Sequence, residues 1–473
     1  MQFFRKIWIT NKAKLSMIKK LLYIPAVVII ASCDQPAKDP EKEISMVQLI
    51  TLDPGHFHAA LVQKKMYEGV DSVVRVYAPP GNDVQLHLDR IKAFNTRPDN
   101  PTHWKEVTYT GNDYFEKMLA EKKGNVIVIA GNNEKKTTYI LKSLEAGLNV
   151  LADKPMAINS ENFDLLKKAF ETAKQKNLLL YDIMTERFEI TSVLQRELSM
   201  LPDVFGVLEK GTADSPAVTM EGGHCFYKYI SGNVLTRPAW FMDASQQGEG
   251  IVDVTTHLVD LVQWECFPGV ILDYSKDIEV LASKRWPTDM SLSQFRTITR
   301  LDTFPAYLQK NLTNDTVLKV WSNGEINYQI RGVHAKVSVV WDYLAAGGND
   351  TYYSMLKGTK ANLIIRQGAG QQYKPALYIE PAGNDTAYEK VVLDQIKNLQ
   401  GKFPGIEAKK INKGWEIVIP EKYKEGHEAH FGRVMENFLT YFKDHNMPPW
   451  EVPGMLAKYY TTTKALEIAL KSK

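Results

Sequence analysis

The sequence predicts an α/β domain with a doubly wound parallel sheet, followed by an α+β domain with a large, mostly antiparallel open sheet. Between residues 46 and 185, short apolar runs alternate with amphipathic segments, which is typical of parallel strands joined by helices. From residue 186 to 473, longer β-rich stretches replace this alternation. The length of 473 residues also favours two domains, because a single core rarely serves so long a chain.

The expected strands of the first domain are short apolar runs, and the expected helices between them have apolar residues three or four apart. A second run ends in two prolines, and one helix ends at Gly147, which suits a helix C-terminus. Residues 82–103, rich in Asn, Asp and Pro, are interpreted as an insertion. The expected strands are 46–52, 73–80, 104–110, 125–131, 149–155 and 178–184, and the expected helices are 57–69, 134–147 and 161–177.

The second domain is expected to form its sheet from β-rich stretches such as 324–332, 335–346 and 361–368. The chain then returns to a helical pattern, with helices expected at 431–445 and 454–472. No internal repeat is found, so the sheet is not expected to be a repeat array.

The first 33 residues have the order of features of a bacterial lipoprotein signal. They hold six basic residues and no acidic one, then the apolar run 21–30, then Ile30-Ala31-Ser32-Cys33. The apolar run is too short to span a bilayer, and a buried N-terminal helix is the competing interpretation. We therefore expect residues 1–33 to be a signal peptide, Cys33 to be lipidated, and residues 34–45 to be a polar linker. The protein would be a membrane-anchored lipoprotein of the periplasm or cell surface.

The charge balance argues against a nucleic-acid partner. The whole chain has 58 basic and 55 acidic side chains, so without the basic signal the remainder is mildly acidic. No basic stripe with interleaved aromatic residues is present. Beyond Cys33 only Cys225 and Cys266 remain, and the sequence leaves open whether they form a disulfide or stay as buried thiols.

Two separated motifs resemble those of the Gfo/Idh/MocA oxidoreductase family (the glucose–fructose oxidoreductase and inositol dehydrogenase type). Residues 125–157 include Asp153-Lys154-Pro155, similar to the family's Glu-Lys-Pro motif, and residues 248–264 contain Asp253 and His257 after a Gly-rich turn. The resemblance extends over most of residues 46–473. It implies a Rossmann dinucleotide-binding domain at 46–185, a substrate and oligomerisation domain at 186–473, and NAD or NADP as cofactor.

The resemblance makes Lys154, Asp253 and His257 the expected catalytic residues. Asp253 and His257 are four residues apart, which would put both on one face of a helix. Oxidation of an alcohol requires removal of the hydroxyl proton, which a histidine can accept. Lys154 could hydrogen-bond the same oxygen, and Asp253 could orient the substrate or tune His257. The alternative roles are a core histidine and a solvated loop lysine.

The expected cofactor loop departs from the dinucleotide fingerprint. In the segment LDPGHFHAA only Gly55 matches a glycine of the pattern, while Asp53 and His58 replace its neighbours. The Asp53 carboxylate would disfavour a pyrophosphate unless it points away. His56 or His58 could instead contact a phosphate at the helix N-terminus. A metal is not expected, because His56-x-His58 has no identifiable third ligand.

Other expected cofactor and substrate positions come from the resemblance and from one unusual segment. By resemblance, Asn133 would lie near the nicotinamide, and Arg187 would belong to an Arg-aromatic turn at the cofactor. No acid follows the second strand, so NAD and NADP cannot be told apart. The segment 222–241 concentrates aromatic and hydrogen-bonding side chains that suit a sugar, although an ordinary strand pair is equally consistent. Its expected substrate-binding residues are His224, Tyr227, Lys228, Arg237 and Trp240.

Three functions are therefore open. The first is an NAD(P)-dependent oxidoreductase acting on a hydroxyl of a sugar or glycoside. The second is an NAD-dependent glycosidase that works by transient oxidation and elimination. The third is a non-catalytic carbohydrate-binding lipoprotein, which the degenerate glycine loop favours and the intact Lys154, Asp253 and His257 set disfavours. The resemblance further implies a homo-oligomer formed through the open sheet.

Overall fold

The computed structural model describes residues 47–230, 233–344, 349–383 and 386–472. The expected signal peptide, Cys33 and the linker lie outside these residues. Everything described below belongs to one compact unit, residues 45–473. Among the residues that the structure describes, no helix is long and apolar enough to cross a membrane. Cys225 and Cys266 are not joined to each other, so of the two alternatives for this pair the one without a disulfide holds.

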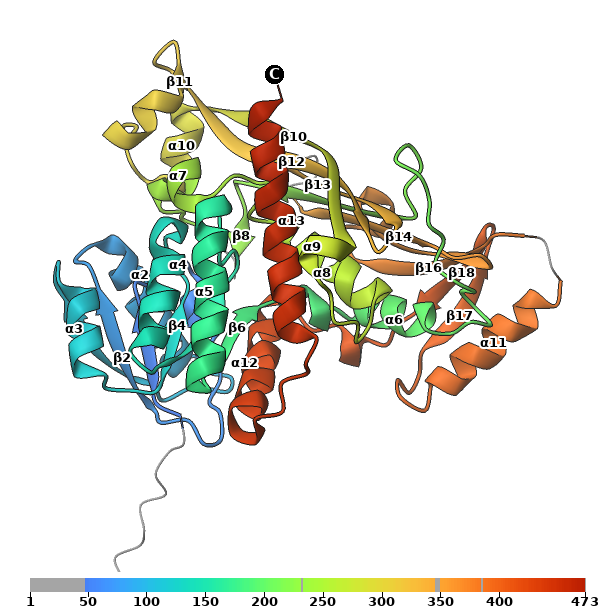
Figure 1. The fold of residues 1–473 in the computed structure, drawn as a ribbon, viewed down its shortest axis with the longest axis horizontal. Coiled ribbons are helices and arrows are strands. Elements are labelled where there is room, and N and C mark those ends of the chain that lie inside the picture. Colours follow the sequence, from blue (N-terminus) through green and yellow to red (C-terminus); the bar gives the residue numbers. More distant parts are fainter. Residues whose placement is uncertain (1–46, 231–232, 345–348, 384–385, 473) are drawn as a thin grey trace, which may run out of the picture. The chain divides into compact units, whose positions relative to one another are not determined.

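The first sheet is parallel and doubly wound, as expected (Figure 1). Its order is β3-β2-β1-β4-β5-β6, and the strands β1, β4, β5 and β6 are buried along nearly their whole length, which explains their continuous apolar sequence. The chain reverses direction across the sheet between β1 and β4, where ligands of such folds bind. The strands are β1 (Leu49–Leu52), β2 (Val73–Ala78), β3 (Lys105–Thr110), β4 (Val126–Ile129), β5 (Asn149–Asp153) and β6 (Leu180–Ile183).

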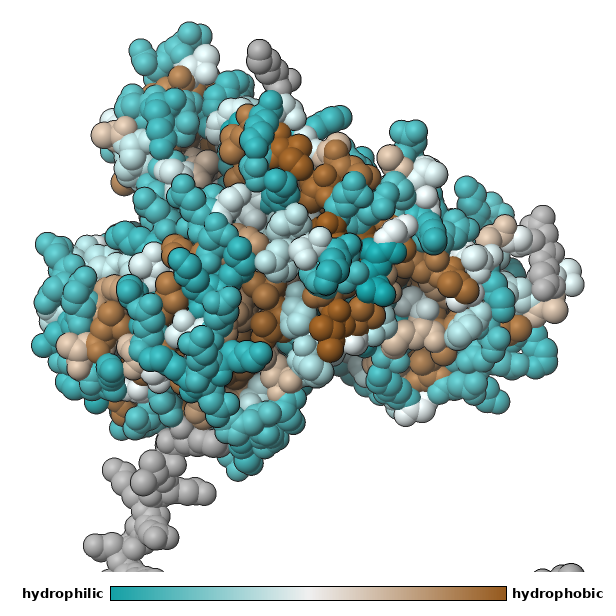
Figure 2. Space-filling view, in the orientation of Figure 1, coloured by the Kyte–Doolittle hydropathy of each residue, from teal (hydrophilic) through white to brown (hydrophobic). Residues whose placement is uncertain are grey.

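Helices connect the strands of this sheet and cover its faces. The outer faces of α4 (Asn133–Glu145) and α5 (Ser160–Lys176) are hydrophilic in Figure 2, as expected for amphipathic helices. The interpretation of residues 82–103 as an insertion is wrong, because α2 (Asn82–Thr96) is the crossover between β2 and β3. Its polar composition hides a narrow buried face of Val84, His87 and Ile91. Helix α3 (Tyr114–Glu121) joins β3 to β4 and was not predicted.

The first crossover helix is much shorter than predicted. The expected helix at 57–69 is reduced to α1 (His58–Leu61). Other side chains occupy the carbonyls that would continue it: Trp104 Nε1 donates to Gln63 O at 2.7 Å, and Arg97 donates to Lys64 O at 2.6 Å. Tertiary hydrogen bonds therefore replace the helical ladder after Leu61.

The second sheet is large, open and mostly antiparallel, as expected. Among the described strands, the pairing of β7 with β13 is parallel and the other pairings of this sheet are antiparallel. The order is β10-β12-β13-β7-β14-β15-β16-β18-β17, with β11 beside β12, and β8 and β9 form a separate hairpin. The bounds are β7 (Val218–Cys225), β8 (Tyr229–Ile230), β9 (Asn233–Val234), β10 (Ile278–Ser291), β11 (Leu312–Thr313), β12 (Val317–Ile330), β13 (Val333–Asp342), β14 (Thr351–Lys357), β15 (Ala361–Gln367), β16 (Ala376–Pro381), β17 (Glu407–Ile411) and β18 (Gly414–Val418).

Helices cover one face of the second sheet, and the C-terminal helices return to the first domain. Helix α13 (Glu451–Lys471) contacts β10 and α8 on one side and α5 on the other (Figure 1). Helix α12 (His427–Asp444) contacts α1 and β6 and adds Phe431, Met435 and Phe438 to the first core. The remaining helices are α6 (Ile190–Ser199), α7 (Ala244–Gln247), α8 (Thr255–Cys266), α9 (Tyr274–Asp277), α10 (Leu292–Thr299) and α11 (Tyr388–Leu399); the 3-10 turns are η1 (Glu186–Phe188), η2 (Ala239–Met242), η3 (Ala306–Asn311), η4 (Ala369–Gln371) and η5 (Glu421–Tyr423).

A buried ion-pair network joins the two domains. Arg187 of η1 makes a bidentate pair with Asp260 of α8, with both N···O distances at 2.7 Å, and donates to Glu451 of α13 at 3.0 Å. Lys458 of α13, which is 0% exposed, lies 2.8 Å from Asp260 and 2.6 Å from Asp182 of β6. The network therefore fixes α8 relative to the end of the parallel sheet.

Candidate active site

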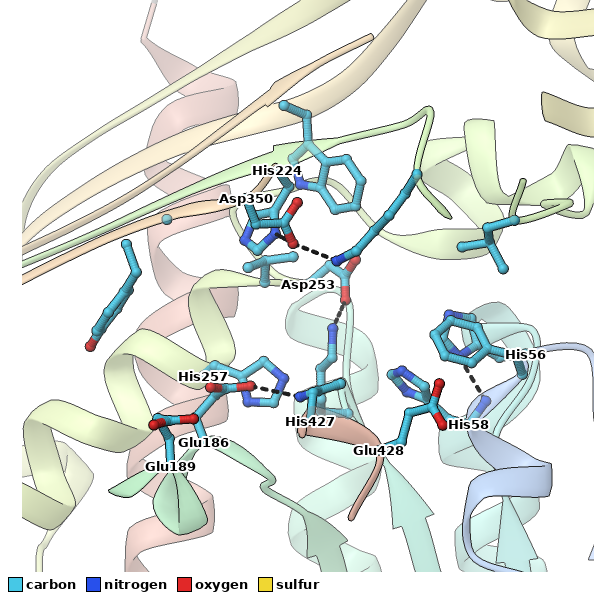
Figure 3. A pocket seen from close by; sticks show the side chains of 18 of the residues that line it. His56, His58, Glu186, Glu189, His224, Asp253, His257, Asp350, His427 and Glu428 are labelled. Carbon is cyan, nitrogen blue, oxygen red and sulfur yellow. Dashed lines mark hydrogen bonds and ion pairs between the residues drawn. The ribbon is translucent and has the colours of Figure 1, made fainter. Parts of the chain in front are cut away.

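A cavity of about 1020 Å³ lies where the carboxyl ends of the parallel strands meet the second sheet. Its walls come from the loop after β1, the ends of β4 and β5, η1, β7, α8 and the start of α12. Figure 3 shows His56 and His58 on one side, Glu186, Glu189 and His257 on the other, and Asp253 between them. The cavity therefore gathers residues that are far apart in the sequence.

A buried ion pair joins the two domains at the floor of this cavity. Lys154, directly after β5, donates from Nζ to Asp253 Oδ1 at 2.6 Å, and the two side chains are only 10% and 8% exposed. Gln247 Nε2 donates to the other carboxylate oxygen at 2.9 Å. Burial alone would raise the pKa of Asp253, but the Lys154 ammonium and these hydrogen bonds hold it below its usual value. Asp253 is therefore ionised and Lys154 has a fixed counter-ion.

His257 lies one turn beyond Asp253 and also lines the cavity. Helix α8 begins only at Thr255, so Asp253 belongs to the turn that leads into it, where its N–H donates to Glu249 O. His257 Nδ1 is buried and has no hydrogen-bond partner among the described residues. Burial, and next the Lys154 charge, lower the pKa of His257 to about 4, so the imidazole is neutral at neutral pH and can accept a proton.

The turn before α8 depends on a glycine. A Cβ atom on Gly250 would lie 1.7 Å from Ser322 O, so no other residue fits without moving β12. This close approach brings the Asp253 segment against the large sheet. The Gly-rich turn of the sequence is thus explained by packing.

Two histidines and a carboxylate face each other on the side of the first domain. His58 Nδ1 lies 2.9 Å from Asp153 Oδ2, and His56 Nδ1 lies 3.8 Å from the same oxygen. Burial is the largest of the effects that lower the pKa of both histidines well below its usual value, so both rings are neutral. All three residues line the cavity.

The opposite wall holds acidic groups that sequence reasoning missed. Glu186 Oε1 of η1 lies 3.2 Å from His427 Nδ1 at the start of α12. Burial, and next the neighbouring Glu186 charge, raise the pKa of Glu189 to about 7. Glu189 therefore exchanges protons near neutral pH.

The wall from the second sheet contains four of the five expected substrate residues. His224, Tyr227, Lys228 and Arg237 line the cavity. Lys228 Nζ and His224 Nδ1 lie 2.6 and 3.3 Å from Asp350 Oδ2, while Asp350 Oδ1 is buried without a partner among the described residues. Asp350 was not predicted, because no sequence pattern links β14 to β7.

Comparisons with known proteins agree with this architecture. Residues 56–181 match the family model described as "Oxidoreductase family, NAD-binding Rossmann fold". Residues 194–470, more than half of the chain, match the model described as "Putative oxidoreductase C terminal domain". The crystal structure of a "putative oxidoreductase" from Parabacteroides merdae is 56% identical, with coverage of 91% of this chain and 98% of that one and a TM-score of 0.89.

The chain belongs to the Gfo/Idh/MocA oxidoreductase family. More distant structures share its fold. Levoglucosan dehydrogenase, solved with NADH and levoglucosan, is 13% identical over 90% of this chain and 98% of that one, with a TM-score of 0.57. An oxidoreductase domain protein from Kribbella flavida is also 13% identical, over 91% and 98% of the two chains, with a TM-score of 0.59. No curated protein matches the chain.

The nicotinamide end of the groove expected for a Gfo/Idh/MocA protein fits a ligand. Asn133 lines the cavity and donates from Nδ2 to Gln247 O at 2.7 Å, while its Oδ1 is buried without a partner among the residues that the structure describes. Gly131 and Lys154 line the same region. Asn133 Oδ1 and His257 Nδ1 are buried without partners among the described residues, so a bound molecule could hydrogen-bond to both.

The pyrophosphate end of the same groove is filled by a side chain. The indole of Trp240 packs directly on Gly55, where a Cβ would lie 3.0 Å from Trp240 Cζ2. Trp240 Nε1 donates to Asp83 Oδ2 at 2.9 Å. Trp240, which was expected at the sugar site, covers the β1 loop and does not line the cavity. A dinucleotide fits this site only if the indole moves.

The carboxylate of Asp53 points away from the groove, as its sequence position required. The residue has a φ of +48°, where the fingerprint has a glycine. Its Oδ2 accepts hydrogen bonds from Tyr139 and Tyr114, at 3.1 and 3.3 Å. Burial raises the pKa of Asp53.

The expected cofactor role of Arg187 is wrong. Its guanidinium is buried and directed to Asp260 and Glu451 in the interdomain network, and it does not line the cavity. The resemblance located the Arg-aromatic turn correctly but could not show which way the side chain points. Its neighbours Glu186 and Glu189 face the cavity instead.

Proposed function

We propose that this chain is an NAD(P)-dependent oxidoreductase that removes hydride from a hydroxyl-bearing carbon of a sugar or glycoside. The observation that carries the proposal is the convergence of Lys154, Asp253 and His257 on one cavity. Lys154, which is paired with Asp253, lies near the neutral imidazole of His257, whose Nδ1 has no hydrogen-bond partner among the described residues. This combination suits an alcohol that loses a proton while its oxygen gains negative charge.

The residues of the chain divide the work on the hydroxyl group. Lys154 donates a hydrogen bond from Nζ to the substrate oxygen and stabilises the charge that develops there. Asp253 pairs with Lys154 and holds its side chain in one direction, because the pair is buried. His257 accepts the hydroxyl proton at its unpaired Nδ1. Bound NAD(P)⁺ would supply the hydride acceptor, and Asn133 is the residue beside which its nicotinamide would lie.

Binding of the dinucleotide requires the η2 segment to move. We infer that Trp240 leaves Gly55 when the pyrophosphate arrives, so that the loop amides face the phosphates. Trp240 also packs in an apolar cluster with Phe241 and Met242 of the same turn, so its displacement moves the η2 segment and breaks the hydrogen bond to Asp83.

The wall from the second sheet supports a carbohydrate substrate. Tyr227 offers an aromatic ring, and Lys228, His224 and Asp350 offer hydrogen-bonding groups on the same wall. A sugar has an apolar face and a polar rim, which match such a wall. Levoglucosan dehydrogenase, which has the same fold, was solved with a sugar derivative.

Oxidation followed by elimination of the leaving group is the second candidate, and Glu189 favours it. Elimination needs a base or acid besides the one that takes the hydroxyl proton. Glu189 has a pKa of about 7 and lines the same cavity, so it is suited to that role.

The test is steady-state turnover of a panel of glycosides and free sugars with NAD⁺ or NADP⁺, followed by reduced-nicotinamide absorbance and by product analysis. Lys154→Ala and His257→Ala are expected to lose about a hundred- to ten-thousand-fold in kcat. His103→Ala, at an exposed position, is the matched control and should keep full activity. Glycoside cleavage without accumulation of reduced cofactor would favour the second candidate. Sugar binding without turnover would favour a non-catalytic binding protein.

We also propose that Cys33 is lipidated and anchors the protein to a membrane of the periplasm or cell surface. The support is the order of basic, apolar and Cys-containing segments in residues 1–33. Cys33→Ala should abolish incorporation of a labelled fatty acid, and equal labelling of both proteins would contradict the proposal.

A homo-oligomer formed through the open sheet is the final element of the proposal. Along β12 and β13 one face is buried, while Glu325, Asn327, Gln329 and Lys336 stand half-buried on the other. Light scattering of the purified protein tests this, and a monomer at micromolar concentration would contradict it.

A further inference from the structure

The geometry points to a binding site for a divalent transition-metal ion of the zinc class, formed by His56, His58 and Asp153. Sequence analysis gave no metal site because the two histidines lacked a third ligand. The structure supplies the third ligand, Asp153, from the end of β5. In the sheet, β4 lies between β5 and β1, the strand that precedes the two histidines. One ligand atom from each of the three residues lies within 4.8 Å of the others.

The distances are close to those of a coordination sphere. Ligands that each stand about 2.0–2.2 Å from a tetrahedral ion lie about 3.3 Å from one another. His58 Nδ1 and His56 Nδ1 are 2.9 and 3.8 Å from Asp153 Oδ2, on either side of that value. All three ligand atoms lie within 4.8 Å of one another, so closing the site around an ion requires side-chain rotations, which also release His56 Nδ1 from the His58 N–H at 3.4 Å.

The chemistry of the donors defines the class of ion. Two neutral imidazoles and one carboxylate are ligands of zinc and of other first-row divalent metals, whereas calcium and magnesium prefer all-oxygen sites. The positive charge of the nearby Lys154 is balanced by Asp253, and this pairing reduces the electrostatic repulsion between Lys154 and a bound cation. The backbone carbonyl of Asp153 accepts a hydrogen bond from the buried Lys136 at 2.9 Å, which fixes the end of β5.

The surroundings leave the site open on one side. The His58 ring packs against Phe57 and Phe431, with ring centroids 4.4 and 4.6 Å apart, so its outer face is shielded. All three ligands also line the cavity that holds Lys154 and Asp253. Three protein ligands with an open position are typical of catalytic rather than structural sites. An oxygen of the molecule in the cavity, or a water, would take that position and be polarised.

The experiment uses the wild-type protein after treatment with a chelator, with neither cofactor nor sugar, so its outcome does not depend on the proposed oxidation. Titration with Co²⁺, read by its d–d absorption, and with Zn²⁺, read by calorimetry, should each show one ion per chain. Zn²⁺ should also raise the melting temperature, because it binds only the folded state.

Two variants test the ligands. Asp153→Asn and His58→Asn should each weaken Zn²⁺ binding by more than about a hundredfold, since loss of even an outer-shell partner costs about ten- to a hundredfold. The amide introduced by His58→Asn can still donate to Asp153, so the fold should survive. His224→Ala is the matched control, because His224 also faces the cavity and pairs with a carboxylate, Asp350, and this variant should keep wild-type affinity.

Absence of a bound ion in the titrated wild-type protein would overturn the inference. Equal Zn²⁺ affinity in wild type and in both ligand variants would overturn it as well. Should either ligand variant fail to fold, the cobalt spectrum of the wild type still decides, because six-coordinate Co²⁺ in water absorbs far more weakly than Co²⁺ in a four-coordinate protein site.

Discussion

Replacing Lys154 by Met should destabilise the protein as well as inactivate it. The side chains of Lys154 and Asp253 are 10% and 8% exposed and 2.6 Å apart, so the variant leaves a carboxylate buried without its cation. Loss of one partner of a buried pair costs about 3–5 kcal/mol, and the lower value is appropriate beside an open cavity. With an unfolding entropy of about 2.1 cal/mol/K per residue, a cost of about 3 kcal/mol lowers the melting temperature of residues 45–473 by about 3 °C.

The double variant Lys154→Met with Asp253→Asn separates the two effects. The amide introduced by Asp253→Asn is neutral and can still accept the hydrogen bond from Gln247, so the double variant should regain most of the lost stability, about 3 °C, while staying inactive. Differential scanning calorimetry measures the stability, and sugar oxidation measures the activity. The reasoning is refuted if the single and double variants melt at the same temperature, because the penalty would then not come from the uncompensated carboxylate.

Three further outcomes are expected. Trp240→Phe should tighten NAD⁺ binding about tenfold in calorimetry, because release of the ring no longer breaks a hydrogen bond to Asp83 worth about 1.5 kcal/mol; equal or weaker binding would show that the indole does not compete with the cofactor. Lys458→Met should cost about 3–5 kcal/mol in urea unfolding, and adding Asp182→Asn should restore part of it; an unchanged midpoint in the single variant would contradict the importance of the network. Finally, kcat/KM should fall as the pH drops through about 4, because His257 becomes protonated in that range and can then no longer accept the hydroxyl proton. A fall of kcat/KM near the usual histidine value of 6.5 that His257→Ala abolishes would show that the pKa of His257 is not lowered.

The fold could be predicted because the apolar periodicity of the sequence follows directly from burial. β4 is covered on both faces, and a continuous apolar run is the mark of such a strand. The periodicity failed where tertiary contacts replaced local ones. The segment after Leu61 has a helical pattern, but Trp104 and Arg97 take the carbonyls that a helix would need.

Of the candidate site, only the residues that belong to the two sequence motifs could be predicted. Lys154 and His257 follow from two such motifs, and the cavity brings them together. Asp350 and Asp153 could not be assigned roles, since each acts through a partner more than ninety residues away in the sequence. The contact of Trp240 with the first domain could not be predicted, because a sequence cannot show that its ring crosses to the other domain.

The buried network around Arg187 determines how ligands can enter and leave. With α8, α13 and β6 joined by Asp260, Lys458 and Asp182, a hinge opening between the domains would expose several uncompensated charges at once. Access is therefore governed by the short η2 segment and not by domain motion. Exchange of a dinucleotide should then be as fast as the rearrangement of one short turn.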